Sequence, residues 1–196
     1  MSGAVRPSTT RYGATLDPAG PWTFDQLADL PEDDRRYEVV DGHLVVTPPP
    51  GQPHQKAGSR LAEELRRTCP KEWEVLQEYA LPLGTDGRVP DLAVVRRQPL
   101  VTGGRPYPQG PSEFGLVVEV MSPSTRKTDL FAKPGEYAEA GIPLFWRAEL
   151  VPELVVHAFR LAGAVYVPVS IISGSGGACP APWGEVQLDL DRIRTG

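Results

Sequence analysis

The sequence has few cysteines and no long apolar run, and these absences exclude several classes of protein. Cys69 and Cys179 lie far apart, so they form neither a disulfide framework nor a zinc-binding pair of recognisable spacing. No run approaches the roughly 18 apolar residues that a membrane-spanning helix needs. The N-terminal segment lacks the apolar core of a secretory signal. We therefore expect a protein of the reducing cytoplasm with no membrane partner.

Positive charge is also scarce. The chain has 20 Lys and Arg against 25 Asp and Glu, which gives a formal net charge of −5. This balance disfavours a general, sequence-blind coat for nucleic acids. A nuclease with a local basic groove and a carboxylate-rich centre is still compatible with it, because net charge says little about one site. Walker and dinucleotide-binding motifs are absent, as is the G-x-S-x-G elbow of serine hydrolases.

The length of 196 residues suits one domain. Residues 1–20 are rich in Pro, Gly, Ser and Thr and predict a flexible tail, so the domain is expected over 21–196. Hydrophobic patterning predicts helices from Thr23, over 54–69 and over 126–140. The predicted strands and turns are a hairpin over 37–46 around Asp41-Gly42, strands over 73–81 and 89–95 joined at Asp86-Gly87, an apolar strand over 115–121, three strands within 142–170, a loop over 173–182 and a last strand from Val186. This pattern predicts one α/β sandwich whose sheet is mixed in direction.

Glu119 is the most informative residue, because it stands inside the apolar run LVVEV. A carboxylate buried there has to be paired, protonated or bound to a metal. Asp91 opens a second apolar strand, PDLAVV, directly after Pro90. If the two strands are neighbours, the two carboxylates converge and make a hard oxygen site suited to Mg²⁺ or Mn²⁺. The simpler alternatives are a strand-end glutamate that faces water or an arginine, and a turn-associated aspartate.

The segments YEVVDGHLV, PDLAVV and LVVEVMSPSTRKTDLFAKPGEYAEAGIPLFW together resemble the Uma-two family, restriction-endonuclease-like proteins of the PD-(D/E)XK nuclease superfamily. The resemblance covers about residues 22–170. It implies an α/β (α+β) fold with a restriction-endonuclease-like mixed central sheet, flanked by helices and carrying extra N- and C-terminal strands. The order and spacing of these segments make the resemblance specific, whereas a lone Pro-Asp pair would carry no information.

The resemblance also implies roles for individual residues. Asp91 and Glu119 match the acidic metal ligands, and Glu38 matches an early acidic residue that approaches the metal. The superfamily lysine normally stands two residues after the glutamate, where this chain has Met121. Lys133 resembles a lysine displaced onto the following helix. The remaining cleft candidates are His54, Gln55, Lys127 as a weaker substitute lysine, and Asp129.

Taken from the residues alone, several of these positions have simpler interpretations. Lys133 could be a solvated helix lysine, Glu38 a surface residue of the hairpin, and His54 only the start of a helix. Asp129 could complement a helix dipole. Pro134 follows Lys133 directly, so the helix is expected to begin or kink there. Tyr137, Phe145 and Trp146 are expected in the core.

The function implied by the resemblance is metal-dependent hydrolysis of DNA phosphodiester bonds, with Mg²⁺ or Mn²⁺ held by Asp91 and Glu119 with help from Glu38. Lys133 would orient water or neutralise charge on the phosphate. The alternative is a nuclease-fold module that binds or regulates without catalysis. A homodimer is expected only by analogy with enzymes that cut two strands.

Overall fold

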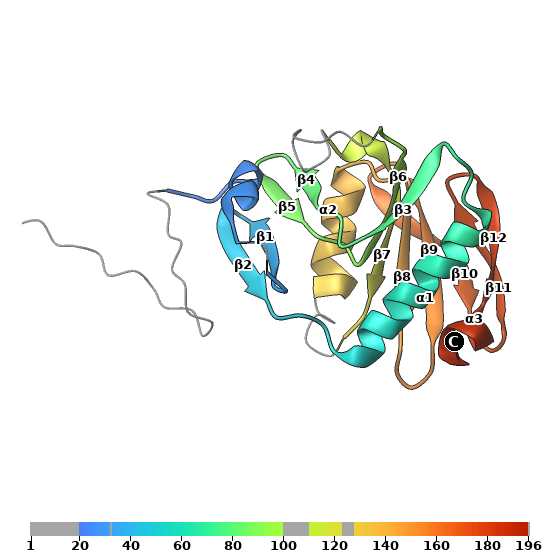
Figure 1. The fold of residues 1–196 in the computed structure, drawn as a ribbon. Helices are drawn as coiled ribbons and strands as arrows, with labels where there is room; N and C mark the ends of the chain where they lie inside the picture. Colours follow the sequence, from blue (N-terminus) through green and yellow to red (C-terminus); the bar gives the residue numbers. More distant parts are fainter. Residues whose placement is uncertain (1–19, 32, 100–109, 123–127, 196) are drawn as a thin grey trace, which may run out of the picture.

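The computed structural model describes residues 20–31, 33–99, 110–122 and 128–195, and Figure 1 shows the arrangement of their helices and strands. In chain order the elements are η1 (Phe24–Asp29), β1 (Arg36–Val40), β2 (His43–Thr47), α1 (Gln52–Thr68), β3 (Trp73–Gln77), β4 (Leu81–Leu83), β5 (Asp86–Arg88), β6 (Leu92–Arg96), η2 (Pro111–Glu113), β7 (Phe114–Val120), η3 (Thr128–Ala132), α2 (Lys133–Glu139), β8 (Leu144–Glu149), β9 (Val155–Ala162), β10 (Val165–Ile172), β11 (Gly176–Ala181), β12 (Gly184–Asp189) and α3 (Leu190–Thr195). Among the described residues, none of these helices is long and apolar enough to cross a membrane.

The centre of the molecule is a six-stranded sheet in the order β10-β9-β8-β7-β6-β3. β7 and β8 run parallel and are joined through α2, as a βαβ connection requires. The other strand pairs of this sheet are antiparallel. The sheet is therefore mixed in direction, as the sequence predicted. A four-stranded sheet, β2-β1-β5-β4, and a β11-β12 ribbon supply the extra N- and C-terminal strands.

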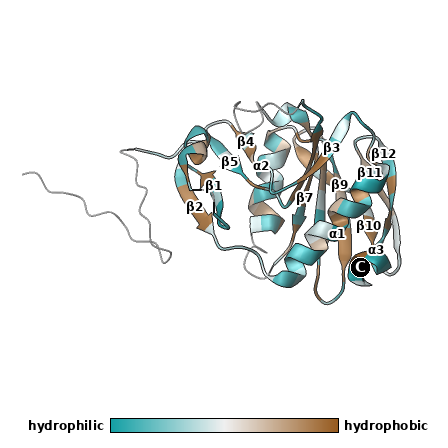
Figure 2. Ribbon diagram, in the orientation of Figure 1, coloured by the Kyte–Doolittle hydropathy of each residue, from teal (hydrophilic) through white to brown (hydrophobic). Residues whose placement is uncertain are grey.

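β7 lies inside the core, as its unbroken apolar run predicted. All seven of its residues are buried. Leu116, Val118 and Val120 share a core cluster with Leu61 of α1, whereas Val117 packs with Tyr137 of α2. Hydrophobic residues gather on these inner strands, and α1 carries hydrophilic residues along much of its length (Figure 2). β7 is thus covered by α1 on one face and by α2 on the other.

The predicted hairpin over 37–46 is confirmed as β1 and β2, which pair antiparallel. Asp41 and Gly42 both have positive φ, 51° and 72°, as a two-residue hairpin turn requires. The hairpin packs against η1, where Phe24 and Leu27 are buried. This small sheet brings the start of β1 to the edge of the central sheet at which Asp91 lies.

The predicted turn at Asp86-Gly87 is wrong. Both residues belong to β5, and the turn lies at Gly84-Thr85. Packing explains the glycine at position 87, because a Cβ there would overlap the ring of Phe24. The single strand expected over 73–81 is also divided into β3 and β4, with Glu78 in a left-handed conformation at φ 50° between them.

Two other expectations change in detail. Residues 173–182 were expected as a loop, but β11 runs through them because each of its residues pairs with β12. The helix expected over 126–140 is a π-helical turn, η3, followed by α2 from Lys133; residues 126 and 127 lie outside the described residues. Pro134 has no N–H to donate to the preceding turn, which explains why regular α-helix starts beside it.

The β11-β12 ribbon offers a test of the packing. A Cβ at Gly176, where φ is 138°, would collide with the carbonyl oxygen of Leu188 on β12. We expect Gly176→Ala to lower the free energy of unfolding by about 3 kcal/mol. A Cβ at Gly177 would meet the Ile172 side chain at an ordinary 3.5 Å, so Gly177→Ala is the control and should cost nothing measurable. Urea denaturation of the two variants checks this, and equal midpoints would contradict it.

Candidate active site

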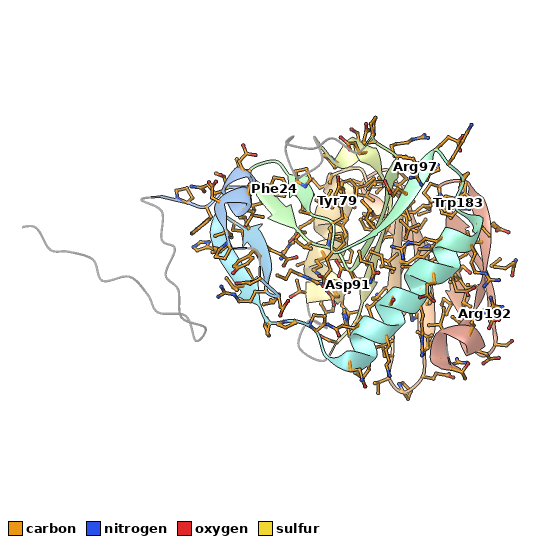
Figure 3. The ribbon with its side chains drawn as sticks, viewed as in Figure 1. Phe24, Tyr79, Asp91, Arg97, Trp183 and Arg192 are labelled. Carbon is orange, nitrogen blue, oxygen red and sulfur yellow. The ribbon has the colours of Figure 1, made fainter. Side chains whose placement is uncertain are left out.

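The strands that carry the two predicted carboxylates are neighbours. β6 and β7 pair antiparallel with Leu92 opposite Val118, so Asp91 lies beside Glu119 at one edge of the sheet. Figure 3 shows Asp91 near the middle of the molecule. The observed register brings Asp91 and Glu119 to adjacent strand positions, as expected, whereas a cation shared by their carboxylates stays a prediction.

Asp91 is buried and held by three groups. Its Oδ2 accepts a hydrogen bond from the Val120 backbone N at 2.7 Å and lies 3.1 Å from His54 Nε2. Its Oδ1 accepts one from Arg36 Nη2 at 2.7 Å. Burial alone would raise the pKa of Asp91, but the His54 hydrogen bond and the Arg36 charge outweigh it and lower the pKa to about 2. Asp91 is therefore a carboxylate throughout the physiological range.

Glu119 is more deeply buried than Asp91, and its side chain points toward α2. Val118 and Val120 pack toward α1, so the alternation of β7 turns Glu119 toward α2. Its Oε2 lies 2.9 Å from Lys133 Nζ, and its Oε1 accepts a hydrogen bond from the Tyr137 hydroxyl at 2.5 Å. Burial raises the pKa of Glu119 to about 8, and the charge of Asp91 adds to this while Lys133 opposes it.

Lys133 is not a solvated helix lysine. It is 4% exposed, and its Nζ also lies 3.1 Å from Asp129 Oδ1. Burial would lower the pKa of Lys133, but the carboxylates around it, Glu119 foremost, raise it. The π-helical turn η3 and the first residue of α2 together place Asp129 and Lys133 on the side of Glu119. π-Helical segments occur often at functional sites, where they re-aim side chains.

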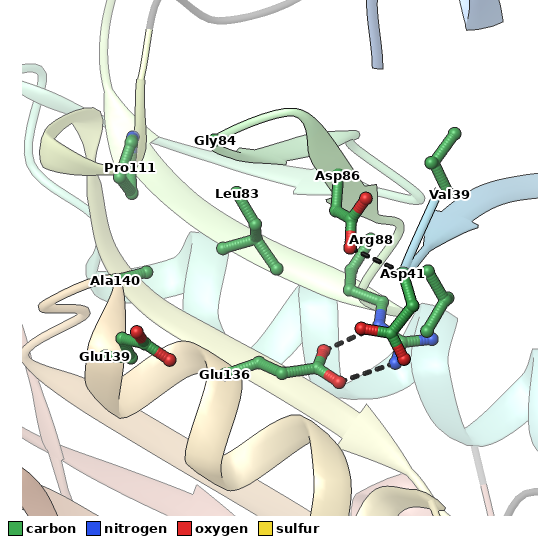
Figure 4. A pocket seen from close by; sticks show the side chains of 11 residues that line it. Val39, Asp41, Leu83, Gly84, Asp86, Arg88, Pro111, Glu136, Glu139 and Ala140 are labelled. Carbon is green, nitrogen blue, oxygen red and sulfur yellow. Dashed lines mark hydrogen bonds and ion pairs between the residues drawn. The ribbon is translucent and has the colours of Figure 1, made fainter. Parts of the chain in front are cut away.

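Glu38 is buried in a network of its own. Its Oε1 accepts a hydrogen bond from the Val89 backbone N at 2.9 Å, and its Oε2 lies 3.4 Å from Arg88 Nη1. Arg88 is in turn clamped by both carboxylate oxygens of Glu136, each at 2.7 Å, on one wall of a pocket of about 420 Å³ (Figure 4). The Glu38 charge contributes to the raised pKa of Lys133. A role of Glu38 at a metal stays a prediction.

His54 and Gln55 lie where the first turn of α1 meets Asp91. Both line a hollow of about 280 Å³, whose wall also includes Asp91 and Glu78. Burial would lower the pKa of His54, but its hydrogen bond to Asp91 raises it. Of the other predicted cleft residues, Asp129 lies at the centre, as described above, and Lys127 is outside the described residues.

Three further residues at this centre were not among the predicted site residues. Arg36 donates to Asp91, and the same Nη2 donates to Glu78 Oε1 at 2.9 Å. Tyr137 was expected only in the core, where it does lie, but its hydroxyl also bonds Glu119. The spacing of Asp129, Lys133 and Tyr137, each four residues after the last, is a helix-face signal that could have revealed this role.

The mixed central sheet, flanked by α1 and α2, gives the chain a restriction-endonuclease-like fold. Carboxylates and cations are buried where its strands β6 and β7 meet. A solved structure from Anabaena variabilis ATCC 29413, described as a "putative nuclease belonging to DUF820", has a similar fold, with a TM-score of 0.69 and 18% sequence identity over 88% of this chain and 97% of that chain. Among curated proteins, none matches the chain. The Uma2 family, "Putative restriction endonuclease", matches residues 24–182, and the chain belongs to this family.

Proposed function

We propose that this protein is a metal-dependent endonuclease that hydrolyses DNA phosphodiester bonds by a PD-(D/E)XK-type mechanism. The observation that carries the proposal is the buried contact between Lys133 and Glu119, 2.9 Å from Nζ to Oε2, next to Asp91. Buried ion pairs are poor devices for stability, since apolar residues of similar volume do as well. Ionisable groups gathered at the ends of two core strands are therefore better explained by chemistry than by stability. Membership of a family described as restriction endonucleases supports this.

The donors at this edge suit a hard divalent cation. Asp91 and Glu119 offer carboxylate oxygens, the ligands of Mg²⁺ and Mn²⁺. Among the described residues, no group of three or more His, Cys, Asp or Glu side chains is arranged to hold a metal ion. Two carboxylates are nevertheless enough for Mg²⁺, which commonly takes one or two and completes its shell with water and substrate phosphates. Asp91 and Glu119 would hold the ion, and Glu38 is the proposed helper. The bound ion would lower the pKa of a ligated water and polarise the phosphate.

The chain's own residues would perform the remaining tasks. Tyr137 fixes the rotamer of Glu119 through its hydroxyl, and the Val120 backbone N fixes Asp91. The Lys133 ammonium, protonated at pH 7, would orient the attacking water or neutralise the charge that develops on the phosphate. Because Lys133 is 4% exposed, this charge acts in a site from which most water is excluded, where it has a stronger effect.

Plasmid nicking tests the proposal. We expect the wild type to nick supercoiled DNA only with Mg²⁺ or Mn²⁺, and Asp91→Ala and Glu119→Ala each to lower the rate by at least about 10³-fold. Glu63→Ala, an exposed acid on α1, is the charge-matched control and should nick as the wild type does. Nicking that survives both site variants would overturn the assignment of the centre.

A second candidate is a binding or regulatory module that keeps the fold without catalysis. It is favoured by one observation, namely that all four carboxylate oxygens of Asp91 and Glu119 already have partners within the protein. Calorimetric titration with Mg²⁺ separates the two candidates. If the protein neither binds Mg²⁺ nor cleaves DNA, the result supports the module. If it binds Mg²⁺ without cleavage, DNA is the wrong substrate. The homodimer and the cytoplasmic location stay predictions.

A further inference from the structure

Arg36 lies where the proposed metal site meets solvent. It is the first residue of β1, and its side chain is only 14% exposed. One of its nitrogens, Nη2, is shared between Asp91 Oδ1 at 2.7 Å and Glu78 Oε1 at 2.9 Å. The two acceptors differ in environment, since the Asp91 side chain is 5% exposed and that of Glu78 is 56% exposed. A single cation thus bridges one buried carboxylate and one that faces water.

Of the two Asp91 oxygens, Oδ1 is the one that an incoming cation would reach by displacing Arg36. Oδ2 accepts from the Val120 backbone N and faces His54, whereas Oδ1 accepts from Arg36 Nη2. A divalent cation that bound Oδ1 would share this oxygen with the Arg36 guanidinium. At such short range the repulsion between the two cations is strong, because little water lies between them. The guanidinium therefore has to leave Oδ1 before the carboxylate can serve as a metal ligand.

Glu78 is positioned to accept the Arg36 guanidinium when it leaves Asp91. Its backbone N–H donates to the Asp91 carbonyl oxygen at 3.1 Å, which fixes the two residues relative to each other. Its φ of 50° is a strained conformation for a glutamate, of the kind that is retained at functional sites. Glu78 and Asp91 both line the hollow of about 280 Å³ next to His54. Arg36 can therefore withdraw from Asp91 while it keeps a carboxylate partner.

Arg36 also retains unused hydrogen-bonding capacity. Its Nε is buried and has no hydrogen-bond partner among the described residues. Buried donors without a partner are rare, and each calls for an explanation. A guanidinium that changes position during function is one such explanation, because its bonds cannot be optimal in both positions.

We propose that Arg36 is an exchangeable counter-ion of Asp91, which neutralises the carboxylate in the absence of metal and moves onto Glu78 when a divalent cation binds. The inference rests on the proposed function, since it concerns the same metal site. It assigns Arg36 and Glu78 as positioning residues that set the metal affinity of Asp91. A purely structural ion pair would instead affect stability and leave metal affinity unchanged.

The experiment measures Mg²⁺ affinity by calorimetry, independently of cleavage. We expect Arg36→Gln to bind Mg²⁺ about tenfold more tightly than the wild type, because the competing cation is lost. Glu78→Gln should bind Mg²⁺ about threefold more weakly, because Arg36 then has no second carboxylate partner. In the double variant the effect of Glu78→Gln should vanish. Arg35→Gln and Glu74→Gln remove the same charges from neighbouring positions outside the site and should leave the affinity unchanged.

Opposite shifts in affinity for the two single variants, with no further effect in the double variant, support the exchange. Wild-type affinity in Arg36→Gln, or equal weakening in both, overturns it and leaves the proposed function intact. If neither the wild type nor Arg36→Gln binds Mg²⁺, both the proposed function and the exchange are wrong. Should Arg36→Gln fail to fold, Glu78→Gln still decides, because its exposed side chain can be replaced without opening the core and an unchanged affinity would overturn the exchange.

Discussion

Lys133→Met is expected to lower metal-dependent nicking by about 10³-fold, the size of effect found when one preorganised transition-state donor is removed. Methionine has a similar length and packs well in a buried position. It carries no charge, so the water or phosphate next to Glu119 would lose its neutralising partner. The Glu119 side chain would keep its hydrogen bond from Tyr137, so the loss should fall on the rate of cleavage.

Single-turnover nicking at saturating Mg²⁺ measures this effect, with circular dichroism and urea denaturation as checks on folding. Breaking a buried pair by removing one partner costs about 3–5 kcal/mol, so reduced stability is expected as well. Lys133→Arg keeps the charge and should fold as the wild type does, with about a tenfold loss of rate because the guanidinium places its charge differently. Lys71→Met, an exposed lysine, is the control. A Lys133→Met protein that nicks within about threefold of the wild type would remove Lys133 from the mechanism.

The sequence was sufficient to predict those parts of the site that depend on local pattern. Glu119 stands out because an ionisable group within an apolar run is unusual, and Asp91 because it immediately precedes the neighbouring strand. The pairing of Leu92 with Val118 then brings them together, as expected from adjacent strands. The hairpin at Asp41-Gly42 could also be predicted from the sequence, since a two-residue turn needs residues that tolerate positive φ.

The parts that could not be predicted depend on contacts between distant segments. Arg36 follows another arginine at the entrance to β1, and nothing in that pair distinguishes Arg36, which reaches Asp91, from Arg35, which pairs with Asp33. Its partner Glu78 lies 42 residues away, and its left-handed conformation has no sequence signal in a glutamate.

Glycine was the other source of error, because its small size serves several purposes. Asp86-Gly87 has the composition of a turn, but Gly87 is required by the Phe24 ring that packs on it. The glycines of β11 suggested a loop, yet they pair along β12, and at Gly176 the close approach of the Leu188 carbonyl excludes any side chain. Composition alone does not separate a glycine that bends the chain from one that lets another atom approach.

Metal affinity is expected to depend steeply on pH, because a carboxylate must lose its proton before it can ligate a cation. Glu119 has a pKa of about 8, raised chiefly by burial. Below that pH most of the protein carries a neutral Glu119, and Mg²⁺ has to displace one proton to bind. Affinity should therefore rise about tenfold per pH unit from pH 6 to 8 and level off above 8. Asp91, with a pKa of about 2, is ionised throughout and contributes no slope.

Calorimetric titrations with Mg²⁺ at pH 6, 7, 8 and 9, in buffers of different ionisation enthalpy, give both the affinity and the number of protons released. About one proton should leave per bound ion at pH 6–7. Burial would lower the pKa of His54, but its hydrogen bond to Asp91, at 3.1 Å, raises it, so any proton that His54 releases has to be removed from the count. His54→Gln provides the control and should retain the slope, because Glu119 faces Lys133 and Tyr137, not His54. If affinity is flat from pH 6 to 9 in both proteins, Glu119 is ionised at neutral pH, and its ion pair with Lys133 overcomes the cost of burial.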